Sequence, residues 1–173
     1  MQIAKLGVIG AGMMGAEIAL VFAMAGKSVM LNDTAQERLD EALKKLSAVL
    51  DTGISRKFWT EEDKTVTLAN IIPTTNLQDF SDRQMVIEAV FEDAEVKGQV
   101  FKKIDKILDP NCIVASNTSS ISITVLSANV SEARQKNFVG LHFFSPVHRM
   151  KLVEVINGMD SSAEALEVAT QAC

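Results

Sequence analysis

The chain has 173 residues, which is enough for one domain with a real core but hardly for two. Its 47% hydrophobic and 23% charged residues are typical of an ordinary globular protein, and a net charge of −5 gives no reason to expect nucleic acid or a membrane surface as partner. The two cysteines, Cys112 and Cys173, lie far apart without the spacing of a metal site, which favours a reducing compartment. No apolar run reaches ~18 residues, so we expect a cytoplasmic protein.

The first apolar run, residues 3–9, predicts a strand that leads into a glycine-rich turn and then a helix. The turn reads Gly10-Ala11-Gly12-Met13-Met14-Gly15. In a dinucleotide site, Gly10 allows the tight turn, Gly12 lets the backbone approach a pyrophosphate, and Gly15 lets the helix pack closely on the strand. The pattern alone also fits a flexible turn. Its context favours cofactor binding, because the predicted helix ends at Gly26, where a C-terminal capping glycine is expected.

A second apolar run, residues 28–33, ends on Asp33, at the ~20-residue distance expected of an acidic residue that binds ribose. A carboxylate there can accept both hydroxyls of the adenosine ribose and would repel a 2′-phosphate. We therefore predict NAD rather than NADP. The alternative role for Asp33 is the N-cap of the next helix, which Thr34 could also fill.

Further along, apolar runs alternate with helical segments in the manner of βαβ units. We predict helices at 35–50, 95–108 and 121–128, and strands at 71–72, 85–87, 112–115, 138–143 and 152–156. Residues 51–63 are polar and are interpreted as a helical excursion with Trp59 as its apolar anchor. Residues 161–173 begin like a serine-capped helix and then stop, so we expect a domain cut from a longer protein. The predicted fold of residues 1–173 is α/β: a Rossmann-type doubly wound, mostly parallel sheet with helices on both faces.

Two polar clusters directly follow predicted strands, at residues 88–93 (EAVFED) and 116–120 (SNTSS). Ligands of open α/β sheets bind at the carboxyl ends of strands, so both clusters should face the same cleft as the glycine turn. We expect Ser120 or Ser122 to cap the helix that begins near Ile121. A second role for SNTSS is hydrogen bonding to a substrate oxygen or to the nicotinamide ribose.

His142 lies between apolar residues, a position more typical of a satisfied core histidine than of a catalyst. Glu154 lies in the next apolar strand, where a carboxylate is costly without a partner. If the two strands form a hairpin, Glu154 would fix the imidazole tautomer and stabilise its protonated form. The pair would then be a general acid/base next to a nicotinamide; the alternative is a buried structural ion pair. His148 and Arg149 are interpreted as surface residues without a clear task.

Four motifs, GAGMMG, EAVFED, SNTSS and HFFSPVHRMKLVEVI, cover roughly residues 3–158 in order. Together they resemble the NAD-binding domain of L-3-hydroxyacyl-CoA dehydrogenases, and EAVFED and HFFSPVHRM resemble especially the dehydrogenase segment of multifunctional fatty-oxidation α-subunits. The resemblance implies NAD as cofactor and an acyl-CoA as substrate. It also implies the activity: oxidation of (S)-3-hydroxyacyl-CoA to 3-ketoacyl-CoA, in fatty-acid β-oxidation or 3-hydroxybutyryl-CoA metabolism.

The resemblance further implies the roles of individual residues. His142 would be the catalytic base, Glu154 its orienting partner, and Ser119 would hold the 3-oxygen of the substrate and touch the cofactor. Asp33 would bind the adenine ribose. Arg56 and Lys57 are candidates for the coenzyme A phosphates, although no sharp motif supports them. The full set expected at the cofactor is Gly10, Gly12, Met13, Met14, Gly15, Asp33, Glu92, Lys97, Ser119 and Ser145, with Glu92 and Lys97 along its nicotinamide half.

Two features depart from the family pattern. Many members have Asn where this chain has Ser145, so one hydrogen bond on the cofactor side can differ. The helical C-terminal domain of the family is absent from these residues. That domain supplies an active-site Asn, much of the acyl pocket and the interface of the homodimer expected for full-length members. Two competing interpretations are a non-catalytic NAD-binding module and a relative that acts on a sugar acid.

Overall fold

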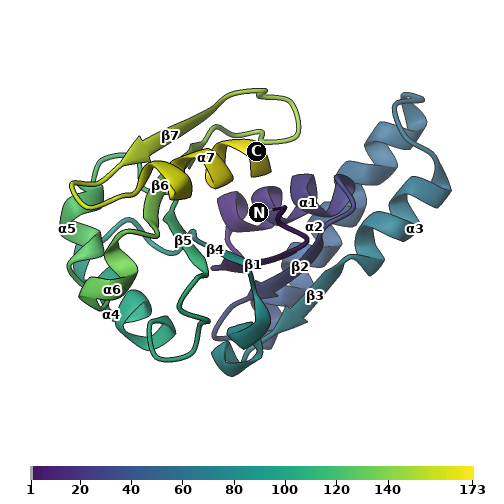
Figure 1. Cartoon of the computed structure of the whole chain (residues 1–173). Coiled ribbons are helices and arrows are strands. Elements are labelled where there is room, and N and C mark those ends of the chain that lie inside the picture. Colours follow the sequence, from purple (N-terminus) through teal and green to yellow (C-terminus); the bar gives the residue numbers. More distant parts are fainter. Residues whose placement is uncertain (1) are drawn as a thin grey trace.

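Seven strands form one sheet, in the order β3-β2-β1-β4-β5-β6-β7, in the computed structural model of the chain, which describes residues 2–173 (Figure 1). The strands are β1 (Lys5–Ile9), β2 (Ser28–Asn32), β3 (Ile71–Thr74), β4 (Met85–Glu88), β5 (Ile113–Ser116), β6 (Phe138–Phe143) and β7 (Val153–Asn157). All neighbours are parallel except β6 and β7. The strand order reverses between β1 and β4, the place where open α/β sheets bind ligands. The predicted doubly wound fold is confirmed.

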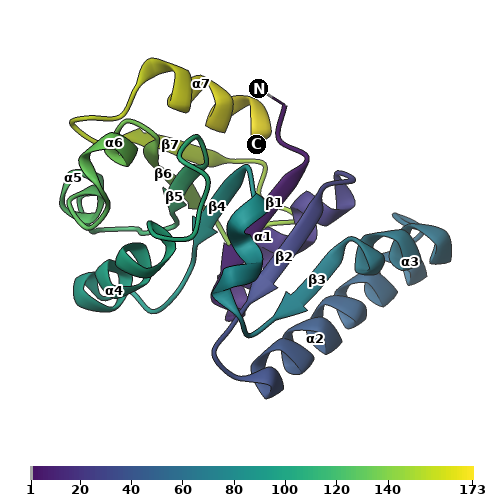
Figure 2. The same cartoon turned by 60° about the horizontal axis from the view of Figure 1, so that its bottom comes forward.

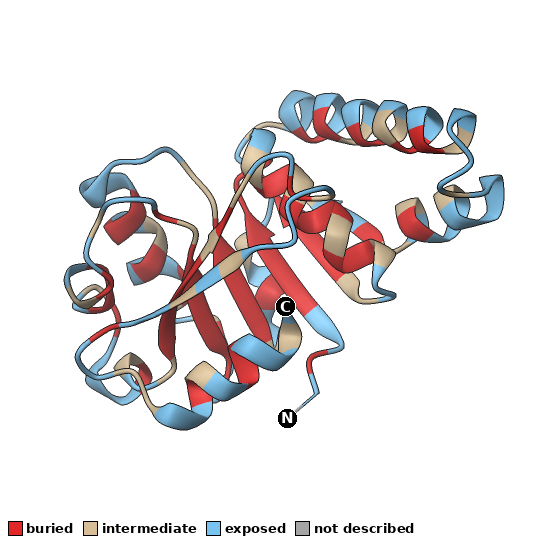
Figure 3. Ribbon diagram, turned by 90° about the horizontal axis from the view of Figure 1, so that it is seen from above, coloured by how far each residue is buried: buried red, intermediate tan, exposed pale blue. Residues whose placement is uncertain are grey.

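Helices cover both faces of the sheet (Figures 1 and 2). One hydrophobic core lies under α1 (Met13–Met24), α2 (Gln36–Ser55) and α7 (Ala163–Ala172). The other core lies under α4 (Ala94–Ile104), α5 (Ile123–Ser127) and the 3-10 helix η1 (Leu77–Asp82). Side chains alternate along a strand, so on β1 Val8 joins the first core and Ile9 the second. Figure 3 shows the central strands as a continuous buried layer between these helices.

The last two strands form the predicted antiparallel hairpin at one edge of the sheet. His142 on β6 lies directly opposite Glu154 on β7 in the register of the pair. Side chains opposite each other on one face of an antiparallel pair are in contact, so the register itself brings the two residues together. At the other edge lies β3, which contains Pro73; an edge strand tolerates a residue that has no N–H to donate.

An arm of two helices, α2 and α3 (Glu61–Ala69), projects from one side of the domain (Figure 2). The predicted end of the helix at residue 50 was wrong, because α2 continues to Ser55 and a separate helix, α3, follows. α3 begins with a capping box, in which Thr60 and Asp63 satisfy each other's backbone N–H groups. Trp59 is confirmed as the apolar anchor: it packs against the core and over Gly53.

Other predicted helix boundaries also differ from the structure. α4 ends at Ile104, before the predicted end at residue 108, and two short elements, η1 and α6 (Glu132–Gln135), were not predicted. At the C-terminal end, Ser162 caps α7 by accepting a hydrogen bond from the Ala165 N–H, so the predicted serine cap is confirmed. Among residues 2–173, no helix is both long enough and apolar enough to cross a membrane.

The contact between Gly53 and Trp59 leads to a prediction about the arm. A Cβ atom at Gly53 would lie 1.9 Å from a ring carbon of Trp59, so Gly53→Ala must displace the ring. We expect this substitution to lower the free energy of unfolding by about 1–3 kcal/mol, measured by urea unfolding. Lys44→Ala, an exposed position on the same helix, is the control and should change stability by less than about 0.5 kcal/mol. Equal stability of the two variants would contradict the packing role of Gly53.

Candidate active site

The glycine turn between β1 and α1 contains two glycines that the fold itself requires. Gly10 has φ of 101°, and a Cβ atom there would lie 2.6 Å from the Ala89 carbonyl oxygen. A Cβ atom at Gly15 would lie 1.8 Å from the carbonyl oxygen of Gly10. Gly12 differs, because a Cβ atom there would meet nothing within 4 Å. The turn is therefore tightly packed toward the protein and open at Gly12, as the approach of a pyrophosphate requires.

Asp33 directly follows β2, and its side chain links the end of this strand to the glycine turn that follows β1. Its carboxylate is only 8% exposed and accepts hydrogen bonds from the Ala11 N–H at 2.9 Å and the Thr34 N–H at 2.8 Å. The alternative that Asp33 or Thr34 caps the next helix is wrong, because Ala35 occupies the N-cap of α2 without any side-chain bond. Asp33 instead fixes the glycine turn and keeps lone pairs for a ligand.

A cleft of about 700 Å³ runs along this end of the sheet. The glycine turn, the end of β2, the loop after β4, one face of α4 and the SNTSS loop form its walls. The predicted cofactor residues that line it are Gly10, Gly12, Met13, Met14, Asp33, Glu92 and Ser119. Lys97 and Ser145 do not line it, and Gly15 lies behind it against the strand.

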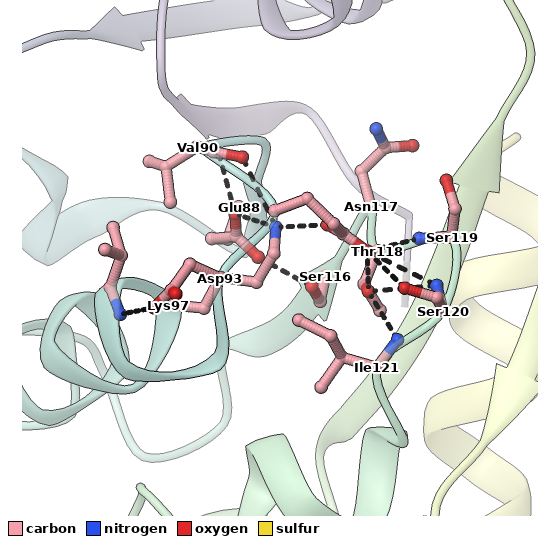
Figure 4. A network of polar contacts seen from close by, with 12 residues as sticks. Glu88, Val90, Asp93, Lys97, Ser116, Asn117, Thr118, Ser119, Ser120 and Ile121 are labelled. Atoms are coloured by element: carbon pink, nitrogen blue, oxygen red, sulfur yellow. Dashed lines mark hydrogen bonds and ion pairs between the residues drawn. The ribbon is translucent and has the colours of Figure 1, made fainter.

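Lys97 lies beneath the cleft in a buried network of charges (Figure 4). Its side chain is 1% exposed, and its Nζ lies 2.7 Å from Glu88 Oε1 and 3.2 Å from Glu92 Oε2. Glu88 is fully buried and also accepts hydrogen bonds from the Ser116 hydroxyl and the Val90 N–H. Lys97 was predicted to lie along the cofactor, but its side chain lies under the cleft and supports Glu92, which lines it.

Glu92 is that residue, and it organises the SNTSS loop. Its Oε1 accepts hydrogen bonds from the Thr118 hydroxyl at 2.5 Å and from the Ser119 N–H at 3.0 Å. Burial by itself would raise the pKa of the Glu92 carboxyl, but the Thr118 hydroxyl, the Lys97 ammonium and the Ser119 N–H lower this pKa to about 2. Glu92 is thus held as an anion.

The helix cap predicted in this loop is confirmed in position at Ser122, but not as a side-chain hydrogen bond. Ser122 occupies the N-cap of α5 but makes no capping hydrogen bond through its side chain. Ser120 directs its hydroxyl to Glu92. The residue that accepts the Ile121 N–H is Thr118, at 3.0 Å. The hydroxyl of Ser119 is left to face another partner.

That partner is His142. Ser119 Oγ lies 3.0 Å from His142 Nε2, and His142 Nδ1 lies 2.8 Å from Glu154 Oε2. An ionised carboxylate can only accept, so Nδ1 of a neutral imidazole carries the proton and Nε2 accepts the Ser119 hydroxyl. The side chain of Glu154 is 53% exposed, which argues against the alternative of a buried structural ion pair. His142 is 17% exposed and packs beside Phe144, so it is not walled off in the core.

The loop between β6 and β7 holds residues whose positions the sequence did not indicate. Ser145 donates its hydroxyl to Glu17 on α1, and the Val147 N–H donates to the same carboxylate at 2.8 Å. The description of His148 as a surface residue was wrong: it packs edge-on against Trp59, and partial burial lowers the pKa of its imidazole. Nothing in the sequence pattern links Glu17 or Trp59 to this loop, because the contacts join distant segments.

Arg56 and Lys57 lie at the tip of the α2–α3 arm, where both are exposed. Lys57 has φ of 61°, in the left-handed region, where the chain turns between the two helices. Neither residue lines the 700 Å³ cleft. Within residues 2–173, no group of three or more His, Cys, Asp or Glu side chains is arranged to hold a metal ion.

The fold and the cleft define a Rossmann-type dinucleotide-binding domain, and comparison with known proteins shows the family to which it belongs. The family model described as 3-hydroxyacyl-CoA dehydrogenase, NAD binding domain, matches residues 5–173. The chain belongs to this family, so the resemblance read from the motifs is confirmed. Its cofactor is NAD, which fits the open approach at Gly12 and the carboxylate of Asp33.

Individual relatives agree with the family. The chain is 46% identical to a fatty acid oxidation complex subunit alpha of Psychrobacter sp. (strain PRwf-1), over 95% of this chain and 23% of the relative. It is 43% identical to a 3-hydroxybutyryl-CoA dehydrogenase of Bradyrhizobium diazoefficiens, over 98% and 57%. The crystal structure of (S)-3-hydroxybutyryl-CoA dehydrogenase from Ralstonia eutropha superposes with a TM-score of 0.95 at 38% identity, over 98% and 59%. The chain thus spans between 23% and 59% of the length of these relatives.

The different surroundings of the glycines predict different effects of adding a methyl group. Gly15→Ala forces the backbone of Gly10 to move, so we expect it to lower the free energy of unfolding by about 3 kcal/mol. Gly12→Ala should leave stability within about 0.5 kcal/mol of wild type, because its Cβ points into open space. It should nevertheless weaken NADH binding by about tenfold, since that space is where the pyrophosphate approaches. Urea unfolding and NADH titration measure the two effects, and an unchanged NADH affinity for Gly12→Ala would contradict the assignment.

The low pKa of Glu92 predicts part of the acid sensitivity of the domain. Because this pKa is lower in the folded than in the unfolded chain, its contribution to stability is complete above about pH 5 and is lost as the pH falls toward about 2. Glu92→Gln should therefore reduce the loss of unfolding free energy between neutral pH and about pH 3, measured with urea. The control is Glu95→Gln, an exposed carboxylate in the first turn of α4, which should retain the wild-type pH dependence. Identical slopes for Glu92→Gln and wild type would refute the charge assignment.

Proposed function

We propose that this chain supplies the cofactor site and the acid/base machinery of an NAD-dependent 3-hydroxyacyl-CoA dehydrogenase. The reaction is the oxidation of (S)-3-hydroxyacyl-CoA to 3-ketoacyl-CoA and its reverse. The observation that supports the proposal most strongly is the continuous contact from Ser119 through His142 to Glu154, with Ser119 on the wall of the NAD cleft. A base within reach of the cofactor is what the oxidation of an alcohol by hydride transfer needs.

His142 acts as the general base in this proposal. Its Nε2 accepts the proton of the substrate 3-hydroxyl, and NAD, when bound in the cleft, would supply the acceptor for the hydride of C3. Glu154 donates nothing; its carboxylate accepts the Nδ1–H and stabilises the imidazolium that forms. Ser119 holds the 3-oxygen in line with Nε2, because its hydroxyl already lies 3.0 Å from that nitrogen.

The substrate side of the proposal rests on the family and on charge. Coenzyme A carries phosphates, and Arg56 and Lys57 present two cations at the tip of the α2–α3 arm, where they are free to meet them. The relatives named above extend well beyond the region that this chain matches. We propose that the acyl pocket is completed by the helical domain that the family resemblance implies, that this domain also forms a homodimer, and that the protein works in the cytoplasm.

The reaction can be tested by NADH oxidation with acetoacetyl-CoA. The assay uses the chain alone and the chain joined to the part of the Bradyrhizobium diazoefficiens relative that lies outside the matched region. In the active form, His142→Gln should reduce kcat roughly a hundredfold or more, and Glu154→Gln should reduce it less, because the base remains while its orienting partner weakens. NADH binding should survive both substitutions.

His148→Gln is the matched control, since this histidine packs against Trp59 and does not line the cofactor cleft. It should retain the wild-type rate. Equal rates for wild type and His142→Gln would end the proposal. Binding of NADH with no turnover in either form of the chain would instead favour a non-catalytic NAD-binding module.

A further inference from the structure

Glu17 is a half-buried carboxylate that has no part in the cofactor cleft or in the proposed chemistry. It lies in the second turn of α1 and does not line the 700 Å³ cleft. Its Oε2 accepts hydrogen bonds from the Ser145 hydroxyl at 3.0 Å and from the Val147 N–H at 2.8 Å. Among residues 2–173, the groups that donate to Glu17 all belong to the loop between β6 and β7, and no ion pair includes it. The carboxylate is therefore committed to this loop.

We propose that Glu17 is a positioning residue for His142 and acts through the loop that follows β6. The inference rests on the proposed role of His142 as the base. Glu17 fixes Ser145, and Ser145 sets where the adjoining Phe144 lies. Phe144 in turn packs on the imidazole of His142. Glu17 thereby limits how far the imidazole can tilt away from the alcohol that it deprotonates.

Two hydrogen bonds by themselves leave the imidazole of His142 one freedom of movement. Ser119 holds Nε2 and Glu154 holds Nδ1, so the ring can still tilt about the line that joins its nitrogens. Phe144 opposes this tilt, because its ring centroid lies 4.5 Å from that of His142 at an interplanar angle of 57°. A tilt would move the Nε2 lone pair out of line with the substrate 3-hydroxyl, and proton transfer depends on that alignment.

The backbone on both sides of Phe144 is anchored to α1. On the side of β6, Phe143 is buried and packs edge-on against Phe22 of α1, with ring centroids 6.1 Å apart. On the other side the strand has ended, and the two hydrogen bonds to Glu17 hold the chain instead. The same helix begins at the glycine turn, so the proposed base and the approach of the pyrophosphate share one frame.

Steady-state kinetics with acetoacetyl-CoA and NADH test this role in the active form of the enzyme. Glu17→Ala removes both acceptors and should lower kcat about tenfold, while the Kd of NADH stays within about twofold of wild type. Glu17→Gln keeps an acceptor oxygen and should recover most of the rate. A contact that served stability alone would change urea unfolding but not the kcat of the folded enzyme.

Ser145→Ala tests whether the effect passes through the loop. It removes one of the two hydrogen bonds and should lower kcat about threefold. Adding Ser145→Ala to Glu17→Ala should cost nothing further, because both substitutions break the same contact. The matched control is Glu41→Ala, since Glu41 lines the same groove between α1 and α2 as Glu17 but is paired with Lys45 at 2.8 Å. It should retain the wild-type kcat.

Chemical modification of His142 needs no turnover and separates this inference from the proposed reaction. Diethyl pyrocarbonate carbethoxylates an accessible neutral imidazole, and the His148→Gln background leaves His142 as the one histidine of the chain. Adding Glu17→Ala to this background should raise the modification rate of His142 severalfold, because Nε2 is then held less firmly against Ser119. Adding Glu41→Ala should leave the rate unchanged.

The inference is overturned if Glu17→Ala leaves the modification rate at the background value. It is also overturned if kcat of the active enzyme stays unchanged, or if NADH affinity falls as much as kcat. A faster modification of His142 without turnover in wild type would contradict the proposed reaction and still support the positioning role of Glu17, so the two failures are distinguishable.

Discussion

The buried ammonium of Lys97 is the constraint on which the candidate site depends. A cation that is 1% exposed is stable only when carboxylates lie within reach, and Glu88 and Glu92 provide them at 2.7 and 3.2 Å. Glu88 ends the central strand β4 and Lys97 lies on α4, so the ion pair fixes the helix to the strand end. Removing one partner would leave an uncompensated buried charge, a change that typically costs about 3–5 kcal/mol.

The order imposed by Lys97 extends to the proposed base through shared hydrogen bonds. Glu92, held by the ammonium, accepts the Ser119 N–H and thereby sets where the serine hydroxyl points. That hydroxyl meets His142, whose orientation is fixed from the other side by Glu154. Two carboxylates thus perform different tasks: Glu92 is locked in place by several donors, whereas Glu154 is half exposed and has the imidazole as its partner. The cleft and the acid/base pair are parts of one connected network.

Most of the fold followed from the sequence because its signals are local. Local residues set the apolar runs that became buried strands, the close approach of Gly15 to Gly10, and the serine cap of α7. The pairing of His142 with Glu154 followed from two strands that are neighbours in the chain. The arm was predicted less well: polar residues after Leu50 indicated the end of a helix, although an exposed helix tolerates them.

The sequence by itself determined the strand–turn–helix unit, the acidic residue after β2 and the family to which the motifs point, because each needs only neighbouring residues or their order. Tertiary structure alone decided that Lys97 lies under the cleft, that Ser145 is bonded to Glu17, and that His148 packs on Trp59. The last two contacts join segments far apart in the chain, whereas Lys97 meets Glu88 and Glu92 across the turn from β4 to α4. The partner that each of these side chains finds depends on distances that only the packed sheet and helices establish.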